Sequence, residues 1–449
     1  MIEIKNKKIT IIGAARSGIA SAELALRKGA IPFVSDISSE EKLLESINRL
    51  KELNVEFEVG KHSKKIFDCD LMIISPGVPT NSEIIIEAKS KNINVISEIE
   101  FASMFCKGKI IGITGTNGKT TTTSLVGHLL SVAGIKNYVA GNIGNAFSNI
   151  SDSISENEFA VLEVSSFQLD LIKNFKPYIS AILNITPDHL DRYDNDLTKY
   201  AQSKQRIYEN QDENDFLILN NDSPILISNL NPHKAIRFNF SSSSKVNKGC
   251  YLKNDDMIFI NDTIEEVICS VNDLFIKGEH NIQNAMAAII IGKILSISNE
   301  KIKEALSTFK GVEHRIEFVR KINGVSFYND SKATNVDSVI VALKSFTNSI
   351  LLILGGRDKG NDYSLIEDLV KDKVKKIYAI GESANKVYDY FNMIVETIKC
   401  DSLEDAVRKS FNDAQSGDVV LLSPACASFD MFKNFEHRGE VFKNLVNQL

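Results

Sequence analysis

Short apolar runs, each followed by a glycine- or serine-rich turn and then by a helical pattern, recur along the whole chain. Clear examples occupy residues 8–12, 110–113, 350–354 and 419–422. Runs of this length bounded by such turns are typical of buried strands. Because these strands alternate with helices, the pattern predicts an α/β protein with mainly parallel, doubly wound sheets.

The pattern falls into three segments. The chain has 449 residues, enough for about three domains of ~150 residues each. A turn at residues 106–108 ends the first segment, and the strand pattern restarts around Gly311. The sequence therefore predicts three domains, 1–106, 107–310 and 311–449. Within the second domain, residues 215–276 predict short strands to which no chemistry is assigned.

Charge and cysteine content narrow the class of protein. The net charge of −6, from 52 basic and 58 acidic residues, argues against a general nucleic-acid-binding protein. The chain runs from Met1 directly into a strand without a signal peptide, and its apolar runs are too short to cross a membrane. Its six cysteines form no C-x-x-C pair, which indicates free thiols in a reducing compartment. We expect a cytoplasmic protein that binds neither membranes nor nucleic acids.

The most informative motif is T-G-T-N-G-K-T at residues 114–120, between a predicted strand and a predicted helix. Gly115 and Gly118 can turn the backbone so that its N–H groups cradle phosphate. Lys119 would reach the outer phosphates, and the Thr120 hydroxyl would hold Mg²⁺. The motif is a variant phosphate loop, because Ile113 stands where the strict pattern has glycine. The alternative is a glycine-rich turn that only caps a helix.

One acidic residue in the second segment is a candidate metal ligand. Glu163 ends the apolar run 159–163. Because a buried carboxylate without a partner is costly, we expect it to meet a cation, and Mg²⁺ held by Thr120 is the obvious candidate. A carboxylate that caps the following helix is the alternative.

The sequence around His189 predicts a functional residue, whereas the sequence around Lys204 predicts a surface residue. His189 follows the predicted strand 179–184, which favours a role with metal or phosphate over the structural role that a lone histidine usually has. Lys204 lies in an amphipathic helical pattern at residues 199–208. By itself, that pattern predicts a lysine on the surface.

The first segment opens like a nucleotide-binding β-α-β unit, with G-A-A-R-S-G at residues 13–18. Ala15 replaces the second glycine of the dinucleotide fingerprint, which disfavours a nicotinamide-dependent dehydrogenase. Another nucleotide diphosphate could still bind at the helix that starts near Ser17. Asp36, at a strand end, could bind a ribose or base, or begin a solvated loop. The turn at 75–79 follows a strand at the edge where ligands bind in such sheets, although this motif alone favours a turn without a ligand.

Polar residues also gather at helix and strand ends further along the chain. Asn281 and Asn284 lie on one face near the start of a predicted helix, where they could contact a base or cap the helix. In the third segment, polar turns follow successive strands at residues 329–335, 354–359 and 423–430. The repeated order of strand, polar turn and helix predicts a second doubly wound sheet whose strand ends converge.

Together these motifs resemble the Mur ligase family over nearly the whole chain. The shared features are T-G-T-N-G-K-T (114–120), G-N-I-G (141–144), L-E-V-S-S-F-Q (162–168), N-I-T-P-D-H-L-D-R-Y (184–193), K-x-R-I-Y (204–208), H-N-x-x-N (280–284) and H-R-x-E (314–317). Members that add D-glutamate are matched by N-D-S-K-A-T-N (329–335), L-G-G-R-D-K (354–359) and S-P-A-C-A-S-F-D (423–430). The first segment matches more loosely.

The resemblance implies three domains: a Rossmann-like domain that binds a UDP-linked substrate, a central P-loop-type ATPase and a C-terminal domain that binds the incoming amino acid. ATP would phosphorylate the terminal carboxylate of UDP-N-acetylmuramoyl-L-alanine. The amine of D-glutamate would then attack the acyl phosphate, leaving an amide, ADP and phosphate. Such a reaction depends on positioning and charge neutralisation. A monomer is expected.

By resemblance, the site residues fall into five overlapping groups. ATP would be bound by Gly115, Thr116, Asn117, Gly118, Lys119, Thr120, Thr121, Thr122, Asn281, Arg315 and Asp330. Two Mg²⁺ sites would use Thr120, Glu163, His189 and a carbamylated Lys204. The catalytic group would be Lys119, Glu163, His189, Lys204 and Lys332. The UDP-linked substrate would meet Ala15, Arg16, Ser17, Asp36, Ser75, Gly77 and Asn142, and D-glutamate would meet Thr334, Lys359, Ser428 and Phe435.

Two other functions remain open on the sequence alone. A folylpolyglutamate-type ligase, or one that adds another amino acid, would share the central segment but differ at residues 330–335 and need not bind UDP. A nucleotide-dependent switch protein would explain the phosphate loop. It would not explain two further doubly wound domains with polar strand ends.

Overall fold

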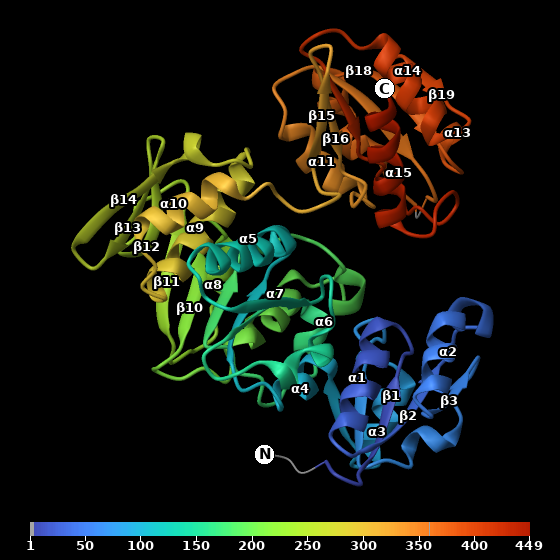
Figure 1. The fold of residues 1–449 in the computed structure, drawn as a ribbon, viewed down its shortest axis with the longest axis vertical. Helices are drawn as coiled ribbons and strands as arrows, with labels where there is room; N and C mark the ends of the chain where they lie inside the picture. Colours follow the sequence, from blue (N-terminus) through green and yellow to red (C-terminus); the bar gives the residue numbers. More distant parts are fainter. Residues whose placement is uncertain (1–3, 359) are drawn as a thin grey trace. The chain divides into compact units, whose positions relative to one another are not determined.

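The computed structural model describes residues 4–358 and 360–449, which build three mainly parallel sheets with helices around them (Figure 1). The three predicted α/β domains with doubly wound sheets are confirmed. The chain divides into two compact units, Met1–Phe275 with Glu279–Phe309, and Ile276–Gly278 with Lys310–Leu449. The first two sheets belong to the first unit and the third sheet to the second. In the described part of the chain, every helix is too short or too polar to span a bilayer.

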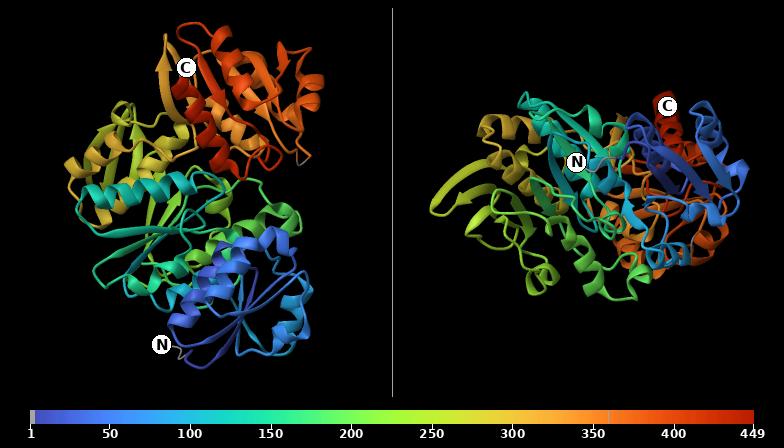
Figure 2. Two further views of the ribbon diagram at one scale, coloured as in Figure 1. Left: turned by 45° about the vertical axis from the view of Figure 1, so that its right-hand side comes forward. Right: turned by 90° about the horizontal axis from the view of Figure 1, so that it is seen from below.

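The first sheet has the order β3-β2-β1-β4-β5, and its paired strands are parallel. Helices cover both of its faces (blue in Figure 2). The apolar run predicted around residue 72 is β4, whose four residues are all buried. The strands are β1 Lys8–Ile12, β2 Ile31–Asp36, β3 Glu56–Val59, β4 Leu71–Ile74 and β5 Asn94–Ser97; the helices are α1 Arg16–Arg27, α2 Leu44–Glu52, α3 Glu83–Ser90 and α4 Glu98–Ser103.

The second sheet has the order β14-β13-β12-β11-β10-β9-β6-β8-β7. Its strands are parallel from β7 to β12, and β13 and β14 extend it as antiparallel hairpins. The short strands predicted for residues 215–276 are therefore this edge of the sheet. The strands are β6 Lys109–Thr114, β7 Asn137–Gly141, β8 Phe159–Glu163, β9 Ile179–Ile182, β10 Phe216–Asn220, β11 Ile236–Ser241, β12 Lys248–Lys253, β13 Asp256–Asn261 and β14 Ile264–Ser270.

Helices of the second sheet position the central site. Helices α5 and α9 pack side by side (Figure 1), and the short α6 packs against α7. The apolar clusters of the first two sheets are continuous, because one core includes both Phe101 of α4 and Phe175 before β9. The helices are α5 Lys119–Val132, α6 Ser166–Leu169, α7 Leu197–Gln205, α8 Pro224–Ser228, α9 Glu279–Ile294 and α10 Asn299–Thr308; a 3-10 turn, η6 Arg206–Tyr208, follows α7.

The third sheet has the order β15-β16-β20-β17-β18-β19, with only the β15–β16 pair antiparallel among its described pairs. Its strands β17 and β20 are buried along their lengths. The elements are β15 Glu317–Ile322, β16 Val325–Asn329, β17 Ile350–Gly355, β18 Val374–Ile380, β19 Thr397–Lys399, β20 Val419–Leu422, α11 Val336–Lys344, α12 Glu367–Lys373, α13 Ala384–Phe391, α14 Leu403–Asp413 and α15 Phe435–Gln448.

The register of the second sheet brings its polar strand ends together. Strand β6 lies between β8 and β9, with Ile113 paired to Glu163 and Thr114 paired to Ile182. The phosphate loop after β6, the acidic end of β8 and the polar segment after β9 therefore share one edge of the sheet, where ligands bind in open α/β sheets.

Candidate active site

The phosphate loop has a backbone that favours glycine at two positions. Gly115 has a φ of +151° and Gly118 a φ of +84°. A Cβ atom on Gly118 would lie 2.5 Å from the side-chain oxygen of Asn284 on α9. Gly118 is also the N-cap of α5, so the loop leads directly into the positive end of a helix, where anions bind.

Lys119 folds back over its own loop. Its Nζ donates hydrogen bonds to the carbonyl oxygens of Gly115 at 2.9 Å and Thr116 at 2.7 Å. This holds the ammonium group over the loop rather than in bulk solvent. These contacts argue against the alternative of a turn that only caps a helix, in which Lys119 would extend into solvent.

Asn184, which the sequence did not single out, fixes the tip of the loop. Its side-chain oxygen accepts the N–H of Asn117 at 2.8 Å, and its amide donates to the Asn117 carbonyl at 3.0 Å. Its backbone carbonyl accepts the N–H of Thr116. The Thr116 hydroxyl donates to the carbonyl of Thr186, so the segment after β9 fixes the position of the loop.

Thr120 and Glu163, predicted to share a cation, are in direct contact. The Thr120 hydroxyl donates to Glu163 Oε2 at 2.7 Å, and the Asn142 amide donates to Oε1 at 2.9 Å. All of Glu163 but 3% is buried. The arrangement offers a hydroxyl oxygen and a carboxylate beside a phosphate loop, which is the donor chemistry that Mg²⁺ prefers. Asn142, assigned to the muramoyl substrate by resemblance, orients Glu163.

Of the remaining predicted nucleotide residues, Thr122 on α5 and Asn281 on α9 are linked through Asn284. Thr121 and Thr122 are buried, and the Thr122 hydroxyl donates to the side-chain oxygen of Asn284 at 3.0 Å. The Asn284 amide donates in turn to Asn281 Oδ1 at 3.1 Å. The asparagine pair therefore connects the start of α9 to the P-loop helix.

The interpretation of Lys204 as a surface lysine is wrong. Its side chain is 1% exposed and its Nζ donates to the Gly115 carbonyl at 2.9 Å. The hydrophobic pattern missed this because α7 is buried on more than one side. Burial, and then the nearby charge of Lys119, lower the pKa of Lys204 well below its usual value.

His189 lies in a different environment. It has a φ of +50° at the start of a 3-10 turn, and its side chain is 58% exposed. The ring packs edge-on against Phe167, with centroids 5.3 Å apart, and Nε2 lies 3.7 Å from Asp188 Oδ1. The described residues contain no group of three or more His, Cys, Asp or Glu side chains arranged as metal ligands. The second metal site stays a prediction.

In the first domain, the ends of β1, β2 and β4 meet at one edge of the sheet. Asp36 accepts the N–H groups of Ala14 at 2.7 Å and Ser38 at 2.8 Å. Partial burial alone would raise the pKa of Asp36, but these donors outweigh it and lower the pKa. A Cβ on Gly13 would lie 2.7 Å from Ser75, so the glycine turn and the β4 turn are in close contact.

The predicted substrate residues of this domain surround that contact. Ala15 and Arg16 are exposed at the start of α1, and the Ser17 hydroxyl lies 3.4 Å from that of Ser75. Gly77 is exposed, and its carbonyl accepts Arg192 Nη2 at 3.0 Å. Arg192, from the segment after His189, was not identified from the sequence.

In the C-terminal unit, Asp330 lies at the end of β16. It is 3% exposed and accepts the Ser423 hydroxyl at 2.7 Å and the Ile316 N–H at 3.2 Å. Burial raises the pKa of Asp330 to about 7, although Ser423 and the half-buried Arg315 act in the opposite direction.

The residues predicted to bind D-glutamate lie on several segments of this unit. One of them, Phe435, is at the start of α15, and its ring centroid is 5.8 Å from Nζ of Lys332, which is predicted to be catalytic. Thr334 is half-buried and Ser428 is buried. Lys359 lies outside the described residues.

A buried arginine that the sequence did not single out joins these segments. Arg438 Nε donates to the Ser331 hydroxyl at 2.9 Å, and Nη2 donates to the carbonyls of Ser331 at 2.8 Å and Cys426 at 3.1 Å. Burial lowers the pKa of Arg438 to about 10. Arg438 joins two polar turns that are distant in the sequence and close in the folded chain. The local sequence pattern therefore does not predict this role.

A phosphate loop, an acidic oxygen donor beside it and two further parallel α/β sheets define a nucleotide-dependent P-loop protein. Three family models match successive parts of the chain: "MurD N-terminal domain" at residues 8–84, "Mur ligase middle domain" at 113–292 and "Mur ligase, glutamate ligase domain" at 314–426. The chain belongs to the Mur ligase family.

Relatives in the family match along their full length. The UDP-N-acetylmuramoylalanine--D-glutamate ligase of Koribacter versatilis is 44% identical over 449 residues, which cover 100% of this chain and 99% of the relative. The protein of the same name from Chloroherpeton thalassium is 44% identical over 464 residues, with the same coverage. The UDP-N-acetylmuramate-alanine ligase MurC of Thermotoga maritima is 19% identical, with a TM-score of 0.62 and 98% and 99% of the two chains covered. At that identity, this last likeness concerns the fold alone.

Proposed function

We propose that this chain is an ATP-dependent ligase that adds D-glutamate to UDP-N-acetylmuramoyl-L-alanine through an acyl-phosphate intermediate, in the synthesis of peptidoglycan precursors. The observation that carries the proposal is the full-length match to relatives that bear this activity in their names. A folylpolyglutamate-type ligase and a switch protein would not account for a match that extends through all three domains.

The geometry of the P-loop supports handling of the γ-phosphate of ATP. Lys119 is held over the loop, and Thr120 and Glu163 offer oxygen ligands next to it. Mg²⁺ would be held by Thr120 and Glu163 and would neutralise phosphate charge. In this role the chain positions and neutralises the reacting groups, which is most of what phosphoryl transfer requires. Arg315, Asp330 and Asn281 would complete the ATP contacts, and Lys332 would stabilise the transferred phosphate.

A second Mg²⁺ site would require a modified Lys204. In this proposal Lys204 carries a carbamate, and the carbamate, Glu163 and His189 are the protein ligands. The buried position of Lys204 and its lowered pKa support a neutral amine, the form that reacts with CO₂. Modification would replace a neutral amine near Lys119 with an anionic oxygen donor.

The flanking domains would bind the two substrates. We assign residues 1–106 to the UDP-linked substrate, residues 107–310 to ATP and residues 311–449 to D-glutamate. Ala15, Arg16, Ser17, Asp36, Ser75 and Gly77 would contact the UDP portion, with Asn142 nearer the muramoyl group. Thr334, Lys359, Ser428 and Phe435 would contact D-glutamate. The six free cysteines support a reducing compartment, and the protein would act in the cytoplasm. It would do so as a monomer.

The direct test is phosphate release from ATP with UDP-N-acetylmuramoyl-L-alanine, screened across D- and L-amino acids. We expect release that requires both the UDP-linked substrate and D-glutamate. Turnover that prefers another amino acid, or that does not need the UDP-linked substrate, would overturn the assignment.

A further inference from the structure

A short segment, residues 170–175, connects α6 to the residues before β9 and is held from the first domain. The Glu100 carboxylate on α4 accepts the backbone N–H groups of Lys173 at 3.0 Å, Asn174 at 2.9 Å and Phe175 at 2.8 Å. Glu100 is fully buried. Three convergent N–H donors on one carboxylate make a strong anchor, because hydrogen bonds to charged groups are stronger than neutral ones.

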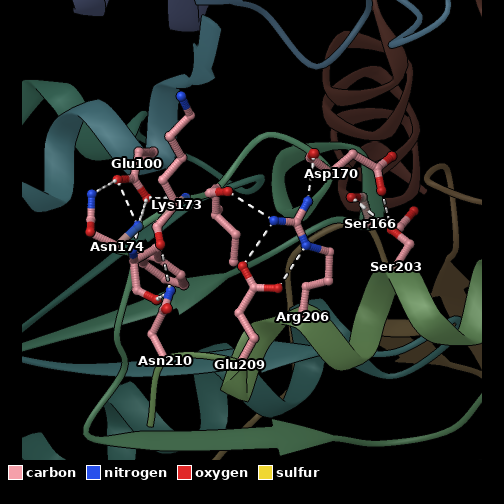
Figure 3. Close-up of polar contacts among 11 residues, drawn as sticks. Glu100, Ser166, Asp170, Lys173, Asn174, Ser203, Arg206, Glu209 and Asn210 are labelled. Atoms are coloured by element: carbon pink, nitrogen blue, oxygen red, sulfur yellow. Dashed lines mark hydrogen bonds and ion pairs between the residues drawn. The ribbon is translucent and has the colours of Figure 1, made fainter. Parts of the chain in front are cut away.

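The same segment is held from its other side by residues just after Lys204 (Figure 3). Arg206 Nη1 donates to the Asp170 carbonyl at 2.6 Å, and Nη2 donates to the Ile172 carbonyl at 2.8 Å. The carbonyl between them, on Leu171, accepts the N–H of Ser97 from the first domain. Asn210 adds bonds to the carbonyls of 173 and 175.

Arg206 is oriented for this role by a second acidic residue. Glu209 accepts Arg206 Nε at 2.9 Å and Nη2 at 2.8 Å, which fixes the plane of the guanidinium group (Figure 3). A planar fork can bond to a carboxylate and to two carbonyls at once, whereas a lysine ammonium cannot reproduce this geometry.

Residues that precede and follow Lys204 in the sequence both form hydrogen bonds to segment 170–175. Ser203, the residue before it, donates its hydroxyl to the Asp170 carboxylate at 2.5 Å. Arg206, two residues after it, holds the Asp170 carbonyl. Between them, Lys204 points to the phosphate loop and donates to Gly115. The position of Lys204 therefore depends on how the end of α7 is fixed to residues 170–172.

We propose that Arg206 is a positioning residue that, through segment 170–175 and Glu100, fixes Lys204 at the phosphate loop relative to the UDP-substrate domain. The inference rests on the proposed function, because it gives Arg206 a role in the ligase reaction. It assigns a task to the arginine of the K-x-R-I-Y motif, which none of the site roles above includes. The proposal also explains why Glu100, a buried residue of the first domain, accepts backbone N–H groups of residues 173–175 in the second domain.

The test compares Arg206→Met, which keeps the length of the side chain without its donors, with the wild-type full-length protein. Misplacement of a reacting group by about 1 Å can cost about 10²-fold in rate, so we expect kcat to fall by about that factor. We expect the KM for ATP to stay within about twofold of the wild-type value. Arg206 does not contact the nucleotide in this proposal, so its loss should not weaken ATP binding in the ground state. Arg49→Met is the matched control, because Arg49 forms a similar pair with Glu52 three residues away on an exposed helix.

A second readout follows the position of Lys204 without using activity. The intact protein is kept free of CO₂ and bicarbonate, so that Lys204 is a bare amine that no carbamate can shield. It is then treated with an amine-acetylating reagent, and modification of each lysine is timed by peptide mass spectrometry. Buried Lys204 should be protected in the wild type relative to exposed Lys89. In Arg206→Met, we expect Lys204 to react at least about tenfold faster, as local opening lowers protection, while Lys89 is unchanged.

Further variants separate positioning from folding and from charge. Arg206→Lys keeps the charge but lacks the fork, so we expect most of the loss to remain; full activity would overturn the proposal. Glu100→Gln should lower kcat in the same direction, and its effect should not add to that of Arg206→Met, since neighbours in one network couple. If Arg206→Met does not fold, these two variants decide the question.

The outcomes separate this inference from the proposed function. Absence of D-glutamate-dependent turnover in the wild type would refute the proposed function, while the protection of Lys204 could still be compared between variants. Normal kcat in Arg206→Met would overturn the inference alone. So would a lowered kcat with Lys204 as protected as in the wild type, because the arginine would then act by another route.

Discussion

Thr120 donates its hydroxyl hydrogen to Glu163 at 2.7 Å, so the start of the P-loop helix and the end of β8 are joined by one hydrogen bond. The other oxygen of Glu163 accepts the Asn142 amide. In the proposed function, the Thr120 hydroxyl and the Glu163 carboxylate would hold Mg²⁺, because both offer the oxygen ligands that this cation prefers. The pair thus combines a structural contact with a candidate metal site.

Glu163→Gln should weaken Mg²⁺ binding while keeping the fold. Glutamine still presents an oxygen to Thr120 but has no negative charge for the cation. We expect turnover to fall by roughly 10²–10³-fold, the usual cost of removing one electrostatic contact at a reacting centre. Phosphate release titrated with Mg²⁺ should show a higher half-saturating concentration. Glu158→Gln, just before the opposite end of β8 and paired with Lys136, is the control and should leave the Mg²⁺ dependence unchanged.

Gly118→Ala should harm both stability and nucleotide binding. Its φ is +84°, and the new Cβ would approach the Asn284 oxygen to 2.5 Å. Gly134 has a similar φ of +74° but open space around it, so Gly134→Ala isolates backbone strain, about 1–3 kcal/mol. Urea unfolding should show a larger loss for Gly118→Ala, and ADP binding should be lost only there. Equal behaviour of the two variants would contradict the close approach to Asn284.

Where residues are adjacent in the sequence, the site was predictable. The run at 110–113 and its glycine turn predicted a strand and a phosphate loop, and the structure has β6 at Lys109–Thr114 and α5 starting at Lys119. Strand, turn and helix are encoded within a few residues by apolar runs and by glycines that permit positive φ.

Contacts between distant segments were not predictable from local pattern. Lys204 sits in a helix whose periodicity suggests exposure, but neighbouring elements cover it almost completely. Asn184 and Arg438 are ordinary polar residues in the sequence, and only the folded chain brings them against the loops that they hold. Burial of a polar side chain depends on which distant partner satisfies it, and periodicity carries no information about that partner.

Asp330 should make the stability of the C-terminal unit depend on pH. Its pKa is raised to about 7 in the folded protein, against about 3.9 in an unfolded chain. Folding favours the protonated carboxyl of Asp330. The stabilisation that this group gives to the folded state is therefore fully present below about pH 4 and is lost as the pH rises through about 7. Asp330→Asn should therefore flatten the decline in stability across this window. Urea unfolding of both proteins at several pH values, followed by a probe in this unit, measures the effect; parallel pH profiles would refute it.

The last prediction concerns the carbamate proposed on Lys204. Glu163 and His189 supply one anion and one neutral ligand, which is few for a Mg²⁺ that would also face ATP and a substrate carboxylate. An unmodified ammonium would be repelled by that cation, and burial beside Lys119 already lowers the pKa of Lys204. The neutral amine that results can form an N–C bond to CO₂ and release one proton to solvent, which leaves a carbamate with an anionic oxygen ligand.

Substitutions at Lys204 distinguish this modification from a simple positive charge. Lys204→Ala should lose most of the activity, and Lys204→Arg should not restore it, because the needed group is an anion. A small carboxylate such as formate or acetate should partly restore Lys204→Ala by occupying the vacated position, and it should leave Lys119→Ala inactive. ¹³C NMR of the wild-type protein in ¹³C-bicarbonate should show a carbamate signal that is absent in Lys204→Ala. Full activity in Lys204→Arg, or active wild-type enzyme with a bare amine at this position, would defeat the prediction.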